Sequence, residues 1–467
     1  MTKKNFKNNE LTLKELLIAT NHEKLVDILL SLHASNEDTQ KRLDIIFAGL
    51  DETPKKIINI IKQEITSLKK CSKFLNYCET DSLADRLYEL RLRIVDDLKT
   101  KSPQIAFEIM LDFLDLHKNT LERVDDSNGI IGDVFSTACE DLASIAKHIN
   151  HFNNQEIVET IFTRFMNNDY GIYDDIILCF KGILKDQDFE FLHKKLEHVA
   201  NDQNAFQIQL GLKSIADCQN NVENYIRACS FNNNICAYDH LDIAKRFIKH
   251  QRPKEALQWL DNMEIFNSHP WQHDKKYLRI QALELDKNHE QAQKERLSWF
   301  AETLNPKLYE EILKIIDPNN KESFQADAIT KAFQFSEPHI SLNFLVQTQN
   351  LEEAAKFVHA RFNELNGRQY YTLRPAADLL KNASPIAATL LYRTMIQAIL
   401  DETKSKYYNY AAKDLVTCGV LNSKITNWGK LQRHHEYLKE IELKHKRKSR
   451  FWFEYDSALQ KNRTLKT

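Results

Sequence analysis

The chain has 467 residues, which is long enough for two or three compact domains or for one array of repeats. Glycine and proline each occur 9 times, about 2% of the residues, where folded proteins usually have about 7% and 5%. Strands, hairpins and tight turns use glycine, so this shortage argues against a sandwich, a barrel or a nucleotide-binding α/β sheet. The 64 basic and 66 acidic residues leave a net charge of −2, which gives no overall attraction to nucleic acid or to an anionic membrane.

The first residues are polar and contain no apolar core of a secretory signal. The longest apolar runs, such as the one beginning at Ile28, are far shorter than the roughly 18 residues that would span a bilayer. The 8 cysteines are scattered and none forms a Cys-x-x-Cys pair. We therefore expect buried free thiols, a cytoplasmic location, no membrane partner and no cofactor.

The N-terminal half shows helical periodicity almost throughout. Leu25, Ile28, Leu29 and Leu32 form one apolar stripe of an amphipathic helix. Two further helices are predicted to begin at Thr53-Pro54 and Ser102-Pro103, with an N-cap hydroxyl followed by proline in the first turn. Short polar breaks are predicted at residues 76–81, 125–129, 150–155 and 167–170. No segment alternates with the period of a strand over a convincing length.

The C-terminal half carries a repeating helix start. Arg252-Pro-Lys-Glu-Ala-Leu, Asn288-His-Glu-Gln-Ala292, Asn350-Leu-Glu-Glu-Ala and Ser384-Pro-Ile-Ala-Ala388 each place a small residue where two helices would touch. The steps between these starts are close to one or two units of about 34 residues, the length of a tetratricopeptide repeat. The Trp-Leu-Gly-Tyr signature of that family is absent. The pattern indicates helical hairpins, which bury their apolar faces by stacking.

These observations predict an all-α protein, an α-solenoid of stacked helical hairpins that is tetratricopeptide-like in its C-terminal half. We divide it into an irregular helical-hairpin domain at residues 1–236, helical repeats with a capping C-terminal helix at 237–453, and a polar tail at 454–467. The division follows a stretch rich in asparagine and glutamine at residues 201–236.

The most singular stretch runs from Asp125 to Asp133 and holds two of the 9 glycines. Asp125, Asp126 and Asp133, with Asn128 between them, present oxygen atoms that would suit a divalent cation or another ligand. The EF-hand template does not fit. The alternative is a capped turn, in which Asp125 or Asp126 accepts backbone N–H groups of the next helix and Gly129 supplies a positive φ.

A basic run, Lys444-His-Lys-Arg-Lys-Ser-Arg450, is followed directly by Phe451-Trp-Phe. Cations next to aromatic rings can hold phosphates and stack bases. Binding of nucleic acid or another polyanion by Lys446, Arg447, Lys448, Arg450 and Trp452 is therefore one interpretation. The other is a final helix whose cations complement its C-terminal dipole and whose aromatic residues close the last hairpin.

Two tyrosine clusters are further candidates for binding. Tyr370 and Tyr371 with Arg374, and the cluster 407–410, would line a groove or pack between hairpins. The histidines 434, 435 and 445 do not complete a metal-ligand pattern. No Walker A, Gly-x-Gly-x-x-Gly, His-Glu-x-x-His or Gly-x-Ser-x-Gly motif is present, so no motif indicates an enzyme, although an enzymatic role stays open.

As a set, several segments resemble a bacterial family of all-helical proteins, a domain of unknown function, some members of which carry a SWIM-type zinc finger ahead of it. The segments are Phe113-Leu-Asp-Leu-His117, Glu122-Arg-Val-Asp-Asp-Ser-Asn-Gly-Ile-Ile-Gly-Asp-Val-Phe135, Asp169-Tyr-Gly171, Glu353-Ala-Ala355 through His359-Ala-Arg361, Leu373-Arg-Pro-Ala-Ala377, Ala387-Ala-Thr-Leu-Leu-Tyr-Arg-Thr-Met-Ile396, Tyr410-Ala-Ala-Lys-Asp-Leu415 and His445-Lys-Arg-Lys-Ser-Arg-Phe-Trp452. The zinc-finger cysteines have no counterpart here. The resemblance implies a helical-repeat fold and a bacterial origin, and it implies no activity.

The function that we expect is an interaction or scaffold module that binds a protein or a peptide on a concave helical-repeat surface. The alternative is nucleic-acid or other polyanion binding through residues 444–450. A metal-dependent enzyme centred on Asp125, Asp126 and Asp133 is a third possibility.

Overall fold

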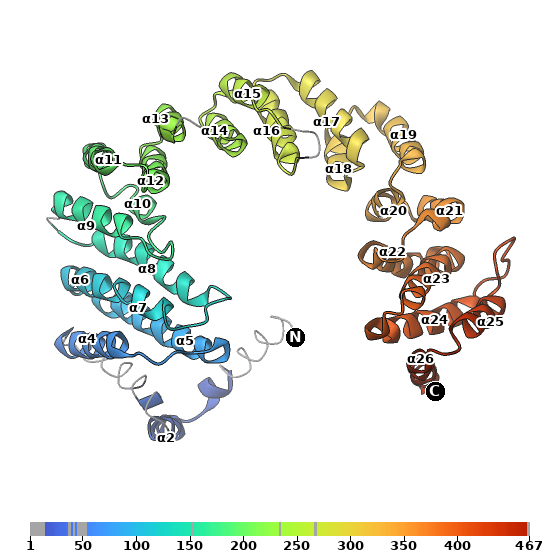
Figure 1. The fold of residues 1–467 in the computed structure, drawn as a ribbon, viewed down its shortest axis with the longest axis horizontal. Coiled ribbons are helices and arrows are strands. Elements are labelled where there is room, and N and C mark those ends of the chain that lie inside the picture. The colour runs from blue at the N-terminus through green and yellow to red at the C-terminus, as the bar shows by residue number, and fades with distance from the viewer. Residues whose placement is uncertain are drawn as a thin grey trace. The chain divides into compact units, whose positions relative to one another are not determined.

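The computed structural model describes residues 15–35, 39–40, 43, 54–150, 153–232, 235–265 and 269–464. Within these ranges every regular element is a helix, and the only strand-like pairing is an isolated bridge between Leu75 and Val124. The predicted all-α class is confirmed (Figure 1). The chain forms two units, Met1–Arg246 and Phe247–Thr467, where we predicted a division between residues 236 and 237.

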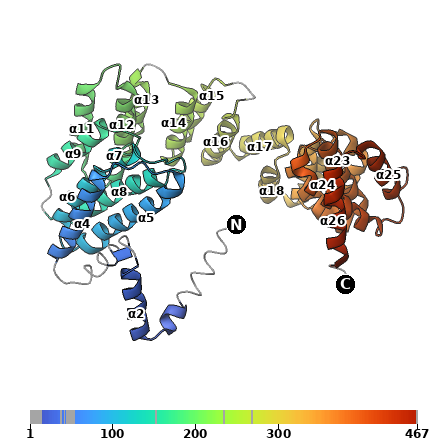
Figure 2. The same ribbon diagram turned by 60° about the horizontal axis from the view of Figure 1, so that its bottom comes forward.

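The helices of the first unit follow one another with short connections. They are α2 (His22–His33), α4 (Pro54–Lys70), α5 (Tyr77–Arg93), η1 (Ile94–Leu98), α6 (Pro103–Leu114), α7 (His117–Leu121), α8 (Ile130–Ala146), α9 (Asn154–Met166), α10 (Ile176–Cys179), α11 (Asp186–Val199), α12 (Ala205–Cys218), α13 (Val222–Cys229), η2 (Ser230–Asn232) and α14 (Ala237–Lys249), whose last turn extends past the boundary. Helix α8 packs against α5 and α6, and α11 packs against α9 and α12 (Figure 2). A continuous apolar core extends from Ile57 to Ala228.

The helix starts of this unit agree with the predicted prolines but not with one of the predicted breaks. Helices α4 and α6 begin at the predicted prolines, although Thr53 lies outside the described residues and Ser102 makes no side-chain cap bond. The predicted break at residues 76–81 is wrong, because α5 begins there. Asn76 and Glu79 form a reciprocal cap: the Glu79 N–H donates to Asn76 Oδ1, and the Asn76 N–H donates to Glu79 Oε2, both at 3.2 Å.

The second unit continues with α15 (Pro253–Asp261), α16 (Gln272–Leu285), α17 (His289–Thr303), α18 (Pro306–Ile315), η3 (Pro318–Asn320), α19 (Lys321–Gln334), α20 (Pro338–Gln347), α21 (Leu351–Arg361), η4 (Phe362–Glu364), α22 (Tyr370–Ala383), α23 (Pro385–Asp401), η5 (Ser405–Tyr407), α24 (Tyr408–Asn422), α25 (His434–His445) and α26 (Ser449–Thr464). Helices α15, α17, α21 and α23 begin where the repeating pattern predicts. Helices α20 to α23 each contact the next one in the series, and α20 also contacts α22 as α21 contacts α23. The apolar core of this unit extends from Ile280 in α16 to Phe451 in α26.

One turn geometry recurs at five helix ends. A non-glycine residue adopts a left-handed conformation, and the N–H of the following residue reaches back five residues. In the turn before α21, Gln349 has φ +60°, and the Asn350 N–H donates to the Leu345 carbonyl at 2.9 Å. This is the Schellman ending of a helix. The five left-handed residues are Asn220, Gln251, Lys287, Gln349 and Thr403.

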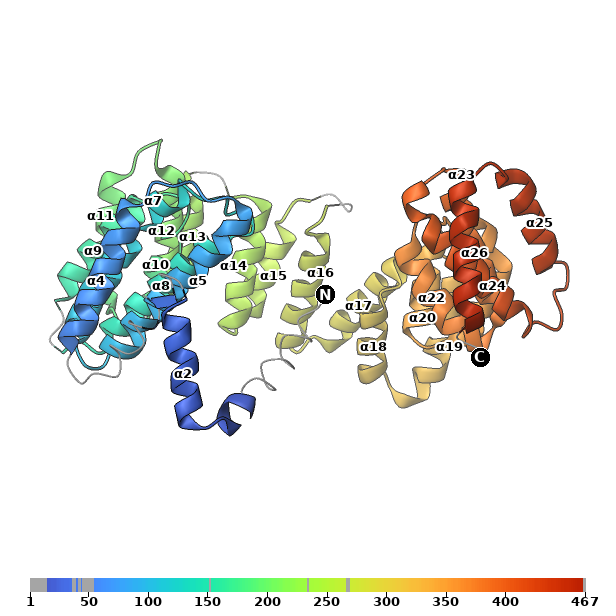
Figure 3. The same ribbon diagram turned by 90° about the horizontal axis from the view of Figure 1, so that it is seen from below.

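The end of the chain differs from the expected polar tail. Residues 454–464 continue α26, which packs against α24 (Figure 3). Tyr455 lies against both Phe451 and Trp452, with ring centroids 6.5 and 5.8 Å away. These apolar contacts explain why the segment is helical despite its polar composition.

Helix α2 follows its predicted stripe but buries none of its residues. Ile28, Leu29 and Leu32 are all exposed. No helix in the described part of the chain is long and apolar enough to cross a bilayer.

Candidate functional site

The Asp125–Gly129 turn is a helix cap. Asp126 accepts the Ile131 N–H through Oδ1 and the Gly132 N–H through Oδ2, both at 2.9 Å. Gly129 has φ +75° at the start of α8. The capped-turn interpretation is therefore confirmed, since both carboxylate oxygens hold the first turn of the helix.

The other polar residues of this turn also bond locally. Asp125 accepts from the Ser127 N–H at 3.3 Å and from its hydroxyl, and Asn128 Oδ1 lies 3.4 Å from the Ile130 nitrogen. Across the described residues, no three His, Cys, Asp or Glu side chains are grouped so that they could hold a metal ion. The structure gives the proposed metal-dependent centre no ligand set.

The basic run lies at the junction of α25 and α26. Lys444 pairs with Asp401 at 3.2 Å, and His445 is buried beside the same carboxylate. Lys448 lies over the Tyr408 ring at 5.9 Å.

The remaining cations of the run are Lys446, Arg447 and Arg450. They are exposed, and none forms an ion pair with any residue that the structure describes. The neighbouring acids are engaged elsewhere: Glu436 accepts the Arg433 N–H and Glu440 accepts from Gln432.

Trp452 serves packing. Its indole N–H donates to the His445 carbonyl at 3.1 Å, and its ring lies 4.9 Å from that of the buried Phe451. The next residue, Phe453, is instead 73% exposed.

The two tyrosine clusters meet at one cavity in the second unit. Tyr370 and Arg374 of α22, Tyr407 of η5 and Tyr410 of α24 line a cavity of about 320 Å³. The Arg374 guanidinium lies 5.9 Å from the centre of the Tyr410 ring. Tyr371 is outside the lining but is exposed beside Tyr370, with ring centroids 6.1 Å apart.

Helix α23 contributes apolar lining to this cavity through Met395, Ala398 and Ile399. Gly367, in the segment before α22, lies close to the same helix. A Cβ atom there would lie 2.2 Å from the Thr394 carbonyl oxygen, far inside van der Waals contact. Only glycine therefore allows this segment to approach α23 so closely.

Two carboxylates outside the lining pair with the cations of the cavity. Arg374 donates from both terminal nitrogens to Asp414, each at 2.6 Å, and this joins α22 to α24. Burial raises the pKa of Asp414, and the Arg374 charge opposes that rise. Arg368 and Lys404 share the second carboxylate, Glu402, whose pKa their hydrogen bonds lower.

We refer to this cavity and its ten lining residues as the tyrosine pocket. The lining consists of Gly367, Arg368, Tyr370, Arg374, Met395, Ala398, Ile399, Lys404, Tyr407 and Tyr410. It brings together Tyr370 and Arg374, which the sequence singled out as one candidate, with members of the second tyrosine cluster. No sequence pattern points to Gly367, Arg368 or Lys404, because their surroundings depend on tertiary packing.

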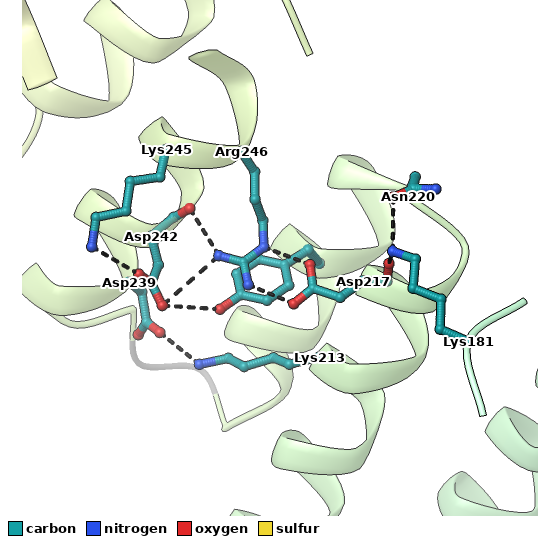
Figure 4. Close-up of polar contacts among 9 residues, drawn as sticks. Lys181, Lys213, Asp217, Asn220, Asp239, Asp242, Lys245 and Arg246 are labelled. Atoms are coloured by element: carbon teal, nitrogen blue, oxygen red, sulfur yellow. Dashed lines mark hydrogen bonds and ion pairs between the residues drawn. The ribbon is translucent and has the colours of Figure 1, made fainter. Parts of the chain in front are cut away.

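A charged cluster that the sequence analysis missed joins α12, α13 and α14 in the first unit (Figure 4). Arg246 donates through Nε and Nη2 to the Asp217 carboxylate at 2.7 and 2.6 Å. Its guanidinium lies 3.4 Å from the centre of the Tyr225 ring. Burial raises the pKa of Tyr225, so this phenol stays neutral.

The outer members of this cluster are also paired. Lys213 pairs with Asp239 at 2.7 Å, and Lys181 donates to Asn220 at 2.9 Å (Figure 4). Each carboxylate of the cluster therefore has a cationic partner inside it, which is typical of a cluster that fastens helices together.

The seven described cysteines are free thiols, but the expectation that they are buried holds only for Cys139, Cys218, Cys229 and Cys418. It is wrong for Cys236, which is exposed, and for Cys71 and Cys179, which are half-buried. Burial raises the pKa of Cys179 to about 11 and that of Cys218 to about 12, so both remain protonated and poorly nucleophilic.

Comparison with known proteins agrees with the resemblance found in the sequence. Among curated proteins, no match to the chain is found. A family described as "Family of unknown function (DUF6880)" matches residues 9–207 and 197–454. These two matches extend over most of the chain, and the chain therefore belongs to this family.

Proposed function

We propose that this protein is an interaction module whose C-terminal unit binds a peptide segment of another protein at the tyrosine pocket. The observation that carries the proposal is the convergence of Tyr370, Tyr407 and Tyr410 on one cavity with an apolar floor. Tyrosine suits such a surface because it combines a large apolar area with a hydrogen-bonding hydroxyl. Exposed aromatic residues of this kind are enriched where proteins bind one another.

We further propose that the helical hairpins stack as a tetratricopeptide-like solenoid and that the pocket belongs to its binding surface. Two features support this arrangement in the second unit: the recurring Schellman turn, and the contacts of α20 with α22 and of α21 with α23 beside those between successive helices. The free thiols agree with a reducing cytoplasm. The bacterial origin stays a prediction from the resemblance.

Site-specific cross-linking tests the proposal. A photoreactive phenylalanine analogue replaces Tyr371 in the full-length protein in its native cell, and irradiation follows. The matched control places the analogue at Phe453, because the two side chains have similar exposure, 68% and 73%. We expect a discrete adduct at Tyr371 that is absent at Phe453 and weakened by Tyr407→Ala. Absence of an adduct at Tyr371, or the same adduct at both positions, would contradict the proposal.

A second candidate function is polyanion binding by the basic run. Its support is the exposure of Lys446, Arg447 and Arg450, which form no ion pair within the described part of the chain. Fluorescence anisotropy with a labelled single-stranded oligonucleotide, at about 50 and 200 mM salt, tests it. We expect binding that weakens as the salt concentration rises and that is lost in the triple variant Lys446→Ala/Arg447→Ala/Arg450→Ala. If that variant binds as the wild type does, this function is excluded.

A further inference from the structure

We infer that the tyrosine pocket selects a peptide in which one large apolar side chain is flanked by carboxylates. This inference rests on the proposed function, because it specifies the partner of the same site. The apolar lining residues indicate a large apolar side chain in the ligand, and the cations Arg368 and Lys404 indicate carboxylates beside it.

The apolar anchor follows from the floor and the size of the cavity. Met395, Ala398 and Ile399 present hydrocarbon groups, and three tyrosines share the lining with them. A volume of about 320 Å³ is at the lower end of ligand cavities, which suits one large side chain with part of its backbone. Such a side chain leaves water for an apolar surface, which favours binding.

The preference for carboxylates follows from the charges of the lining. Three cations, Arg368, Arg374 and Lys404, line the tyrosine pocket, and none of its lining residues is acidic. The carboxylates that pair with these cations, Asp414 and Glu402, lie outside the lining. Arg374 is neutralised by Asp414, but Arg368 and Lys404 share the single carboxylate of Glu402, so one positive charge is left over for an incoming carboxylate.

Two other cavities of the same unit differ in having acidic residues in their lining. A cavity of about 430 Å³ includes Glu284 and Glu311 in its lining, and one of about 200 Å³ includes Glu295 and Glu302. In both, acids accompany the cations. Among these three cavities, only the tyrosine pocket has cationic residues and no acidic residue in its lining.

Arg368 and Lys404, rather than Arg374, have donors to offer. Arg374 already uses both terminal nitrogens on Asp414, so its role is to position Tyr410. Arg368 bonds Glu402 through Nε, and its two terminal nitrogens have no acceptor among the described residues. The side chains of Arg368 and Lys404 are 64% and 46% exposed, so a carboxylate can reach both. The terminal nitrogens of Arg368 can hold it in a bidentate manner.

Methionine-methyl NMR of the full-length protein tests the inference. The chain has 5 methionines, and Met395 alone among them lines the pocket. The probes are capped peptides of sequence Glu-Glu-Phe-Glu-Glu, Lys-Lys-Phe-Lys-Lys and Glu-Glu-Gly-Glu-Glu. We expect the first to shift the Met395 signal, assigned with Met395→Leu, while the Met110 and Met263 signals stay in place.

The size of the effect separates the anchor from the charge. Replacing phenylalanine by glycine should weaken binding at least about tenfold. The double variant Arg368→Gln/Lys404→Gln should weaken Glu-Glu-Phe-Glu-Glu about three- to tenfold. Lys356→Gln, an exposed cation elsewhere in the unit, serves as the matched control and should change nothing.

Each alternative outcome is decisive. Equal shifts with the glutamate and lysine peptides would overturn the carboxylate preference while leaving peptide binding intact. If the glycine peptide binds as well as the phenylalanine peptide, the apolar anchor is wrong. If no peptide moves Met395, the inference fails altogether, and the cross-linking at Tyr371 then decides the proposed function independently.

Discussion

Gly367→Ala should strongly destabilise the second unit. The new Cβ would lie 2.2 Å from the Thr394 carbonyl oxygen and 2.7 Å from the Ala398 Cβ. A normal contact needs roughly another ångström, and the obstacle is the backbone of α23, which cannot rotate aside as a side chain does. Overpacking typically costs about 1–3 kcal/mol, so we expect a loss near 3 kcal/mol.

The natural tryptophans make this loss measurable. All 5 lie in the second unit, so their fluorescence during urea unfolding reports on that unit: Trp259, Trp271, Trp299, Trp428 and Trp452. A loss of about 3 kcal/mol corresponds to a melting temperature lower by about 6–12 °C for a unit of this size.

Gly419→Ala is the matched control. A Cβ atom there would first meet His434 Nε2 at 3.3 Å, which is the tip of a side chain. The small displacement is offset by the better helix propensity of alanine within α24, so we expect a change within about 1 kcal/mol. If Gly367→Ala changes stability no more than Gly419→Ala does, the close approach to α23 is not as described.

Four further changes have definite expected outcomes. Asp126→Ala removes both cap bonds of α8 and should cost about 1–2 kcal/mol in urea unfolding followed by circular dichroism; unchanged stability would contradict the cap. Gln349→Gly should gain up to about 1 kcal/mol by relieving a left-handed φ, and a loss would refute this reasoning. Trp452→Ala should lower stability by about 2 kcal/mol, because the ring packs against Phe451 and Tyr455 and its N–H donates to the His445 carbonyl; an unchanged melting temperature would contradict that packing. Burial, then the charges of Arg393 and His435, lower the pKa of His434 to about 4. The neutral side chain therefore contributes fully to the stability of the fold above about pH 6.5, and this contribution is lost as the pH falls toward 4. His434→Gln should flatten this part of the pH profile of unfolding, and an unchanged slope would exclude the effect.

Helix starts could be predicted because their signals are local. Pro54, Pro103 and Pro253 mark first turns, and the structure begins helices at each of them. The start of α5 also has a local signal: the polarity of Asn76 and Glu79 predicts a break, but their three-residue spacing is that of a capping box, and the structure begins a helix there. The distinction depends on spacing rather than on polarity.

The left-handed turns between helices could not be predicted from composition. A shortage of glycine usually means few left-handed turns, yet five helices of the described chain end in a Schellman turn whose left-handed residue is not glycine. The residues at these positions are asparagine, glutamine, lysine and threonine. Their left-handed backbone is unfavourable for an L-residue, and the packing of the helices must offset this destabilisation. The sequence therefore predicts the helices that follow, but it does not identify the left-handed residue itself.

The candidate site was predictable only in part. Tyr370 and Arg374 stood out because aromatic and basic residues cluster there, and helical spacing places them on one face. Their pairing with residues near 410 is a tertiary fact: Arg374 and Asp414 are 40 positions apart. The pairing also changes the chemistry, since Asp414 occupies the cation that the sequence favoured for binding and leaves that role to Arg368.

The asparagine-rich stretch at residues 201–236 shows why polarity alone does not define a domain boundary. Asn221 Oδ1 accepts the Asn224 N–H at 2.9 Å and caps α13, while Asn220 takes the left-handed turn before it. Arg246 of α14, just beyond this stretch, bonds Asp217 of α12, which lies within it, so the stretch is fastened to the helix that follows. In a protein made of short helices, every turn needs polar caps for the free N–H groups. Polar clusters are then expected at each turn, and long-range ion pairs such as that of Arg246 determine which turns lie inside a unit.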